Sequence, residues 1–230
     1  MTLHIGIVGC SAEGAALCYR TICTEGSRVL GQHIHPEVSM HTPSFDLYVE
    51  CLNRNDIQGV ADLMLDSANK LAKIGADLLI CPDNTIHNAF NLVEPKSPRP
   101  WLHIARVVAE EAARRGFKKV GILGTRWLVA SSVYPEQLSA RGIEAIRPSD
   151  AEREEISRII MDELVVGDFR PQSISYFQTT IENFSKKGCD AVALGCTEIP
   201  LIINDSNSVL PTLDSTRLLA QAAVRRAIQA

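Results

Sequence analysis

The sequence predicts an α/β fold made of two pseudo-symmetric, three-layer lobes, each with a parallel sheet covered by helices on both faces. Two observations carry this prediction. Short apolar strands alternate with helical segments along the chain, which is the pattern of parallel sheets. In addition, the second half of the chain repeats patterns of the first half at a nearly constant offset.

The first strand and the first helices have clear local signals. Residues 3–9 are a short apolar run rich in β-branched residues that ends in glycine, and helix-forming residues follow over 12–24. A helix is expected over 56–74, because Asp56 can cap it, apolar residues recur at helical spacing, and Gly75 ends it.

The same alternation continues to the end of the chain. Further strands are expected at residues 77–81, 119–124, 143–146, 190–194 and near Val209. Further helices are expected at residues 104–115, 131–140, 151–166, 172–187 and 215–229.

Two segments interrupt the alternation and are predicted to cross between the lobes. Three prolines fall within residues 95–100, where they remove backbone donors and favour an extended path. Residues 204–211 are the predicted return crossing, after which the last helix packs on the first lobe. The predicted first lobe is therefore 1–97 with 208–230, and the predicted second lobe is 98–207.

An internal repeat relates the two halves of the chain. Residues 5–10 (IGIVGC) pair with 120–125 (VGILGT), and residues 75–85 (GADLLICPDNT) pair with 188–198 (GCDAVALGCTE). Two similar lobes would explain the nearly equal offsets, although gene duplication and β-α-β punctuation alone can also produce such strings.

Composition excludes several classes of protein. Apolar residues make up 46% and charged residues 22% of the 230 residues, which argues against disordered and fibrous chains. The net charge of −4 provides no basic surface for nucleic acid. Apolar runs are too short to span a membrane and the N-terminus lacks a signal-peptide pattern, so a cytoplasmic location is expected. Seven cysteines without a C-x-x-C pair argue against a disulfide framework and a zinc module.

Polar residues follow the repeated strands, at the edge where parallel sheets bind ligands. Asp83 and Cys196 come from equivalent strand ends. If the lobes face each other about a pseudo-twofold axis, these two side chains approach one cleft from opposite sides. Such a cleft suits a small molecule that is attacked on both faces.

Several short motifs together point to a family. They are I-G-I-V-G at 5–9 followed by Tyr19 and Arg20, N-T-x-H at 84–87, L-H-I at 102–104, G-I-L-G-T at 121–125, Tyr134, and G-C-T-E-I-P at 195–200. Over nearly the whole chain this pattern resembles the aspartate/glutamate racemase family, which works without pyridoxal phosphate. The G-C-T-E-x-P string is a specific signal.

The resemblance implies an isomerase with two α/β lobes, one catalytic cysteine from each, no cofactor, and a homodimeric assembly. No metal site is expected, because the spacing of Cys81, Asp83 and His87 fits no common one. Cys196 matches the second catalytic cysteine of the family. The chemistry fits, because racemisation needs an acid and a base on opposite faces of Cα, and a thiolate can serve near neutral pH. The substrate contacts expected from the resemblance are Ser11, Asn84, Thr85, His87, Thr125, Thr197 and Glu198.

Asp83 departs from the family pattern, because it stands where the first cysteine would be, directly before N-T. Reference pKa values of ~3.9 for Asp and ~8.5 for Cys make an unperturbed carboxylate the weaker base by roughly 6 kcal/mol. Burial next to a thiolate would narrow this difference. The sequence therefore predicts an asymmetric site, in which Cys196 exchanges protons well and Asp83 does so slowly or not at all. Cys81, two residues earlier, is expected to pack in the core.

Three functions stay open at this point. The first is a racemase or epimerase for aspartate, glutamate or a similar small amino acid. The second is a related single-cysteine isomerase or decarboxylase of a small carboxylate. The third is a degenerate protein that binds an amino acid, with Asp83 paired to the ammonium group.

His87 also has two interpretations, since it lies three residues past Asn84 and can either serve the site or hydrogen-bond the start of a helix.

Overall fold

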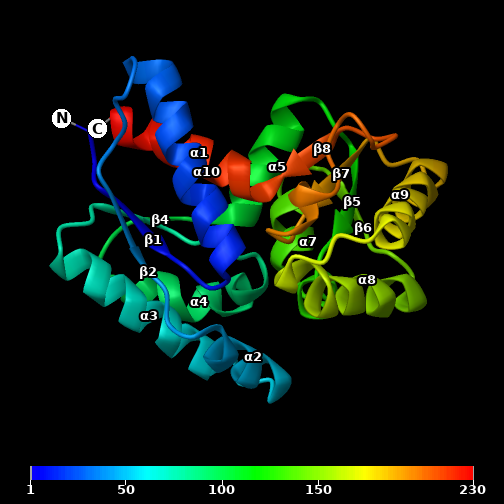
Figure 1. The fold of residues 1–230 in the computed structure, drawn as a ribbon, viewed down its shortest axis with the longest axis horizontal. Helices are drawn as coiled ribbons and strands as arrows, with labels where there is room; N and C mark the ends of the chain where they lie inside the picture. Colours follow the sequence, from blue (N-terminus) through cyan, green and yellow to red (C-terminus); the bar gives the residue numbers. More distant parts are fainter. Residues whose placement is uncertain (1, 230) are drawn as a thin grey trace. The chain divides into compact units, whose positions relative to one another are not determined.

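The computed structural model describes residues 2–229, which form two compact units (Figure 1). The first unit contains the chain up to Ile104 and again from Thr216 onward, and the second unit is Ala105–Ser215. The last helix, Ser215–Ile228, lies in the first unit except for its first residue.

The first unit is built on a parallel sheet. Its strands are β1 (Ile5–Val8), β2 (Val38–His41), β3 (Leu78–Ile80) and β4 (Trp101–Leu102). They lie in the order β2-β1-β3-β4, with Ile7 of β1 in register with Ile80 of β3.

Helices cover both faces of this sheet, with α1 and α10 on one face and α3 on the other (Figure 1). The α-helices are α1 (Ala12–Leu30), α2 (Phe45–Asn53), α3 (Ile57–Lys73), α4 (Phe90–Val93) and α10 (Ser215–Ile228). Two 3-10 helices are η1 (Thr85–Ala89) and η2 (Glu94–Lys96).

The second unit repeats this architecture. Its strands are β5 (Lys119–Leu123), β6 (Glu144–Ile146), β7 (Ala191–Leu194) and β8 (Thr212–Asp214), all parallel, in the order β6-β5-β7-β8. The strand order is the same as in the first sheet when strands are taken in chain order. The prediction of two similar parallel α/β lobes is confirmed.

Helices α8 and α9 cover one face of the second sheet, and α5 and α7 cover the other (Figure 1). The α-helices are α5 (Ile104–Arg114), α6 (Arg126–Ala130), α7 (Val133–Ser139), α8 (Asp150–Asp162) and α9 (Pro171–Lys186), and the 3-10 helices are η3 (Leu164–Val166) and η4 (Ile199–Leu201). Leu123, Val192 and Leu194 of the strands pack with Phe177 and Phe184 of α9 in the core of this unit.

The chain crosses between the units later than the sequence suggested. The proline segment forms η2 and leads into β4, which completes the first sheet, and the return segment leads into β8, which completes the second. The first crossing therefore follows Ile104 rather than residue 97, and the second follows Ser215 rather than residue 207. Strand β4 has two residues and strand β8 has three. Strands this short give no periodic pattern of their own.

Residues 38–53 hold two elements that the sequence did not predict, β2 and α2. β2 is an edge strand with only partly buried side chains, so it lacks the apolar signature of a buried parallel strand. Within residues 2–229, none of the helices combines the length and apolarity needed to cross a membrane.

Candidate functional site

In the first unit, two turns meet at the carboxyl edge of the sheet. One follows β1 and leads through Ser11 into α1, and the other follows β3 and leads through Asp83 into η1. Because β1 and β3 are adjacent and parallel, both turns lie at the same edge. The predicted contacts Asn84 and Thr85 are buried in the second turn.

Three hydrogen bonds to Asp83 fix its turn. The Asp83 carboxylate accepts a hydrogen bond from the backbone N–H of Ile86 through Oδ1, at 3.2 Å. The Asp83 carbonyl accepts one from Nδ1 of His87 at 2.7 Å and a weak one from the Cys81 thiol at 3.7 Å. The side chain of Asp83 thus caps the turn that it belongs to.

His87 links this turn to the start of α5. Its Nε2 accepts a hydrogen bond from the backbone N–H of Ile104 at 3.3 Å, so its Nδ1 carries the proton that goes to Asp83. Burial lowers the pKa of His87 to about 4, so the ring is neutral at neutral pH. The ring also stacks on Phe90 and meets His103 edge-on. Both ring nitrogens therefore bind backbone groups, as in the helix-start interpretation of His87.

Behind Asp83 lies a buried polar region that the sequence did not reveal. Tyr48 of α2 is fully buried, and burial together with nearby Cys81, Cys10 and Asp83 raises the pKa of its hydroxyl well above the usual value. No residue in 2–229 forms a hydrogen bond of good geometry with this hydroxyl, although the Ser67 hydroxyl lies beside it. Sequence reasoning missed Tyr48 because helix α2 itself was missed.

Cys81 is buried in the first unit, as predicted. Its side chain has no exposed surface, and burial and the Asp83 charge raise the pKa of its thiol well above the usual value. A thiol held in this state is a poor nucleophile and a poor base.

In the second unit, two glycines let the ends of β5 and β7 approach closely. A Cβ atom on Gly195 would lie 2.6 Å from the carbonyl oxygen of Leu123, and one on Gly124 would lie 3.0 Å from the carbonyl oxygen of Gly195. A side chain at Gly195 would require the backbone to move, and one at Gly124 would press on the Leu128 side chain and the Gly195 carbonyl. This close approach brings the turns that begin at Thr125 and Cys196 to the same place on the sheet edge.

The hydroxyls of Thr125 and Ser11 occupy equivalent positions in the two units. The Thr125 hydroxyl accepts a hydrogen bond from the N–H of Leu128, and the Ser11 hydroxyl accepts one from the N–H of Gly14, both at 3.3 Å. Each residue is the N-cap of the helix that follows the first strand of its unit. The repeat predicted from sequence therefore extends to the caps.

In the second unit, the thiol of Cys196 contacts the carboxylate of Glu198. Its thiol is half-buried and donates a hydrogen bond to Oε2 of Glu198 at 2.9 Å. The hydroxyl of Thr197 donates to the same oxygen at 2.7 Å. Three consecutive residues of the G-C-T-E-I-P string thus form one hydrogen-bonded group around Oε2 of Glu198.

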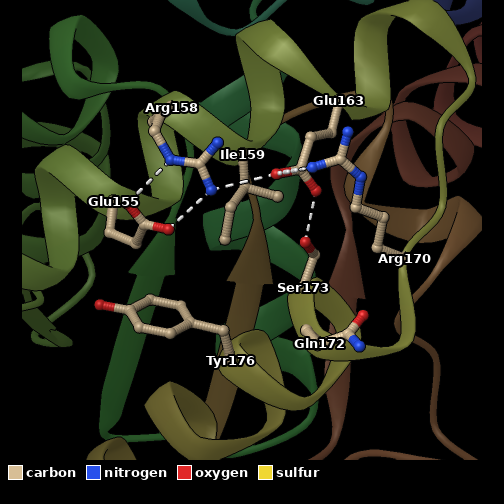
Figure 2. A pocket seen from close by; sticks show the side chains of 8 residues that line it. All are labelled: Glu155, Arg158, Ile159, Glu163, Arg170, Gln172, Ser173 and Tyr176. Atoms are coloured by element: carbon tan, nitrogen blue, oxygen red, sulfur yellow. Dashed lines mark hydrogen bonds and ion pairs between the residues drawn. The ribbon is translucent and has the colours of Figure 1, made fainter.

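A separate cavity of about 350 Å³ lies between α8 and α9 (Figure 2). It is occupied by an ion-pair network around Glu163, which accepts hydrogen bonds from Arg170 and Ser173 and pairs with Arg158 at 3.0 Å. Arg158 also pairs with Glu155, so the charges in this cavity neutralise one another. None of the predicted site residues lines it.

No group of three or more Cys, His, Asp or Glu side chains within residues 2–229 is placed to hold a metal ion. The family model for Asp/Glu/hydantoin racemases matches residues 7–223. The chain belongs to this family.

Similar proteins agree with this membership. The broad-specificity amino-acid racemase RacX of Bacillus subtilis (strain 168) is 26% identical over 165 residues, which is 70% of this chain and 69% of that protein. A solved structure from Yersinia pestis, assigned to the Asp/Glu racemases, is 30% identical with a TM-score of 0.90, covering 99% of this chain and 100% of that one. An aspartate racemase homologue from Pyrococcus horikoshii OT3 is 27% identical with a TM-score of 0.84, covering 99% and 100% of the two chains.

Proposed function

We propose that this family member is a cofactor-independent amino-acid racemase or epimerase with an asymmetric site. Its substrate is aspartate, glutamate or a similar small amino acid. Cys196 exchanges the Cα proton on one face of the substrate, and Asp83 exchanges it slowly or not at all on the other. The observation that carries the proposal is the Cys196 thiol hydrogen-bonded to the buried Glu198 in the G-C-T-E-I-P turn.

The reaction needs only a proton transfer at Cα. The Cys196 thiolate takes the Cα proton, so that the C–H bond breaks, an S–H bond forms, and the electron pair stays on the substrate as a carbanion. Backbone and side-chain donors at Asn84 and Thr85 would hold the substrate carboxylate, over which part of this negative charge spreads. Return of a proton to the same face regenerates the substrate, and return to the opposite face inverts it.

Asp83 explains why the two faces should differ. Its carboxylate already accepts the N–H of Ile86 and so caps its own turn, and an ordinary carboxylate is a much weaker base than a thiolate. A carboxylic acid at position 83 is therefore a poor partner for a Cα proton. A carboxylate is, however, well suited to bind the ammonium group of an amino acid.

The ability of the Asp83 carboxylate to bind an ammonium group also favours a second candidate function. In this function the protein binds an amino acid and does not convert it. A related single-thiol isomerase or decarboxylase acting on a small carboxylate is the remaining alternative. We further propose a cytoplasmic homodimer, on the strength of the family resemblance; light scattering coupled to gel filtration tests the dimer.

The test is hydrogen exchange at Cα in D₂O, followed by proton NMR for the L and D forms of aspartate, glutamate and other amino acids. We expect loss of the Cα signal for one enantiomer, and no loss with Cys196→Ser. This assay detects exchange on one face, which a chirality assay would miss. Binding of an amino acid without any exchange would replace the racemase with the binding protein.

A further inference from the structure

The peptide unit that joins Leu194 to Gly195 leads into the turn that begins at Cys196, and it is held from both sides. Its N–H, on Gly195, donates a hydrogen bond of 2.8 Å to the carbonyl of Leu123 at the end of β5. Its carbonyl, on Leu194, accepts a hydrogen bond of 2.7 Å from the hydroxyl of Ser215. One strand end and one side chain therefore fix the direction in which the chain enters this turn.

Ser215 makes its contact from the first residue of α10. Leu194 and Asp214 are the last registered pair of strands β7 and β8, so the Ser215 hydroxyl joins the two chains one residue beyond the paired strands. Ser215 has no exposed surface. Because water does not replace a lost donor at a buried carbonyl, this contact is costly to break.

Tyr134 of α7 supports both Ser215 and Gly195. Its hydroxyl forms a hydrogen bond with the hydroxyl of Ser215. A serine hydroxyl has one proton, and that of Ser215 goes to Leu194, so the hydroxyl of Tyr134 is the donor. Burial raises the pKa of Tyr134 well above its usual value, so this proton stays in place near neutral pH. The ring also lies beside Gly195, since a Cβ atom there would be 3.5 Å from Cε2 of Tyr134.

The first unit has a related contact at the equivalent place. Helix α5 follows the fourth strand of that unit, and the N–H of its first residue, Ile104, binds His87, which binds the carbonyl of Asp83. In both units the first residue of the helix after the fourth strand thus helps to hold the chain beside Asp83 or Cys196. The contact in the first unit uses a backbone group, whereas the contact in the second depends on the hydroxyl of Ser215.

We propose that Ser215 is a positioning residue, whose hydroxyl, oriented by Tyr134, holds the Leu194 carbonyl and with it the turn that carries Cys196. Ser215 acts on the substrate only through this backbone. The assignment rests on the proposed function in making Cys196 the group that exchanges the Cα proton. A small displacement of the turn should lower the rate of proton transfer more than it weakens binding of the substrate.

Amide hydrogen exchange of the full-length protein, resolved by peptide mass spectrometry, measures how firmly the turn is held. We expect Ser215→Ala to speed up exchange in the peptide over 195–200 at least about fivefold, because a buried carbonyl loses its donor. Tyr134→Phe keeps the ring and the Ser215 hydroxyl, so a smaller increase of at least about twofold is expected. The double variant should exchange no faster than Ser215→Ala alone, since no Ser215 hydroxyl is left to orient.

Ser173→Ala is the matched control for a general loss of stability. Ser173 is a buried serine of the same unit, and its hydroxyl donates to Glu163 (Figure 2). We expect this variant to speed up amide exchange at the start of α9 and to leave residues 195–200 at the wild-type rate.

The same variants are assayed for loss of the Cα proton signal in D₂O. We expect Ser215→Ala to lower kcat about tenfold or more while KM changes less than about twofold. Ser173→Ala should keep the wild-type values of both constants.

Wild-type amide exchange over 195–200 in Ser215→Ala would overturn the assignment, and so would an equal increase in every peptide of the unit. Faster amide exchange with an unchanged kcat would also overturn it. If Ser215→Ala does not fold, Tyr134→Phe decides by the same criteria. Since amide exchange involves no amino acid, a loosened turn in a protein whose wild type exchanges no Cα proton would refute the racemase and leave the hold of Ser215 on the turn standing.

Discussion

The imidazole of His87 donates a hydrogen bond of 2.7 Å from Nδ1 to the backbone carbonyl of Asp83, and its other nitrogen accepts the N–H of Ile104. A single neutral ring thus ties the turn that carries Asp83 to the first residue of α5. The position of Asp83 therefore depends on His87, whose two ring nitrogens both bind backbone groups.

Removal of the bridge should destabilise the first unit. His87→Ala leaves a buried carbonyl and a buried N–H without their partner, each at a cost of about 1–3 kcal/mol. We expect urea unfolding to show a loss of at least about 1 kcal/mol. Unfolding at the wild-type midpoint would mean that the bridge does not hold the turn.

The same ring predicts how stability depends on pH. The pKa of His87 is about 4 in the folded protein, below the value near 6.5 of an exposed histidine. Between these values the unfolded chain binds a proton that the folded protein does not, so this contribution to stability is lost as pH falls from about 6.5 toward 4. The slope from one such group is at most about 1.4 kcal/mol per pH unit.

Unfolding in urea at pH 7, 6 and 5 measures this dependence. His87→Gln should show a shallower decline than the wild type. The exposed His33, replaced by Asn, is the matched control and should keep the wild-type slope. Equal slopes in all three proteins would contradict the buried neutral ring.

Gly195 should tolerate no side chain. A Cβ atom there would meet the carbonyl oxygen of Leu123 at 2.6 Å, so Gly195→Ala must move the backbone just before Cys196. Overpacking of this kind costs about 1–3 kcal/mol, and we expect Cα exchange to fall with it. Gly142→Asn is the control, because Gly142 has a φ of +68° and open space around it. Wild-type stability and exchange in Gly195→Ala would show that the two strand ends do not need their close approach.

Tyr48→Phe should leave stability unchanged or slightly higher. The hydroxyl of Tyr48 is buried and makes no hydrogen bond of good geometry with residues 2–229, so its removal relieves a polar group that lacks a partner. We expect a change between zero and about 1 kcal/mol in favour of the variant, measured by urea unfolding. A loss of more than 1 kcal/mol would reveal a hydrogen bond that stabilises the region behind Asp83.

Much of this architecture could be predicted from sequence because the chain repeats itself. The two equivalent strand ends, with Asp83 after one and Cys196 after the other, follow from comparing the chain with itself. Strand β2 and helix α2 were not predicted, since β2 has no buried side chain and α2 buries only Tyr48 and Leu52. Tyr48 was missed with them.

The roles of individual polar groups depend on partners that are distant in sequence. His87 binds the N–H of Ile104, seventeen residues away, and no local pattern announces this contact. Glu163 and Glu198 are equally buried, yet among residues 2–229 two arginines pair with Glu163 and none pairs with Glu198. Arg158 of α8 and Arg170 at the start of α9 reach Glu163 because these helices pack together. The residue type alone does not predict such partners.

The comparison of proton exchange on the two faces of Cα tests the asymmetric site most directly. Loss of the Cα proton signal in D₂O and inversion of the amino acid are followed together, in the wild type and in Asp83→Cys. We expect the wild type to exchange one enantiomer much faster than it inverts it, and Asp83→Cys to raise the rate of inversion. Equal exchange of both enantiomers by the wild type, or an unchanged or lower rate of inversion in Asp83→Cys, would contradict the account.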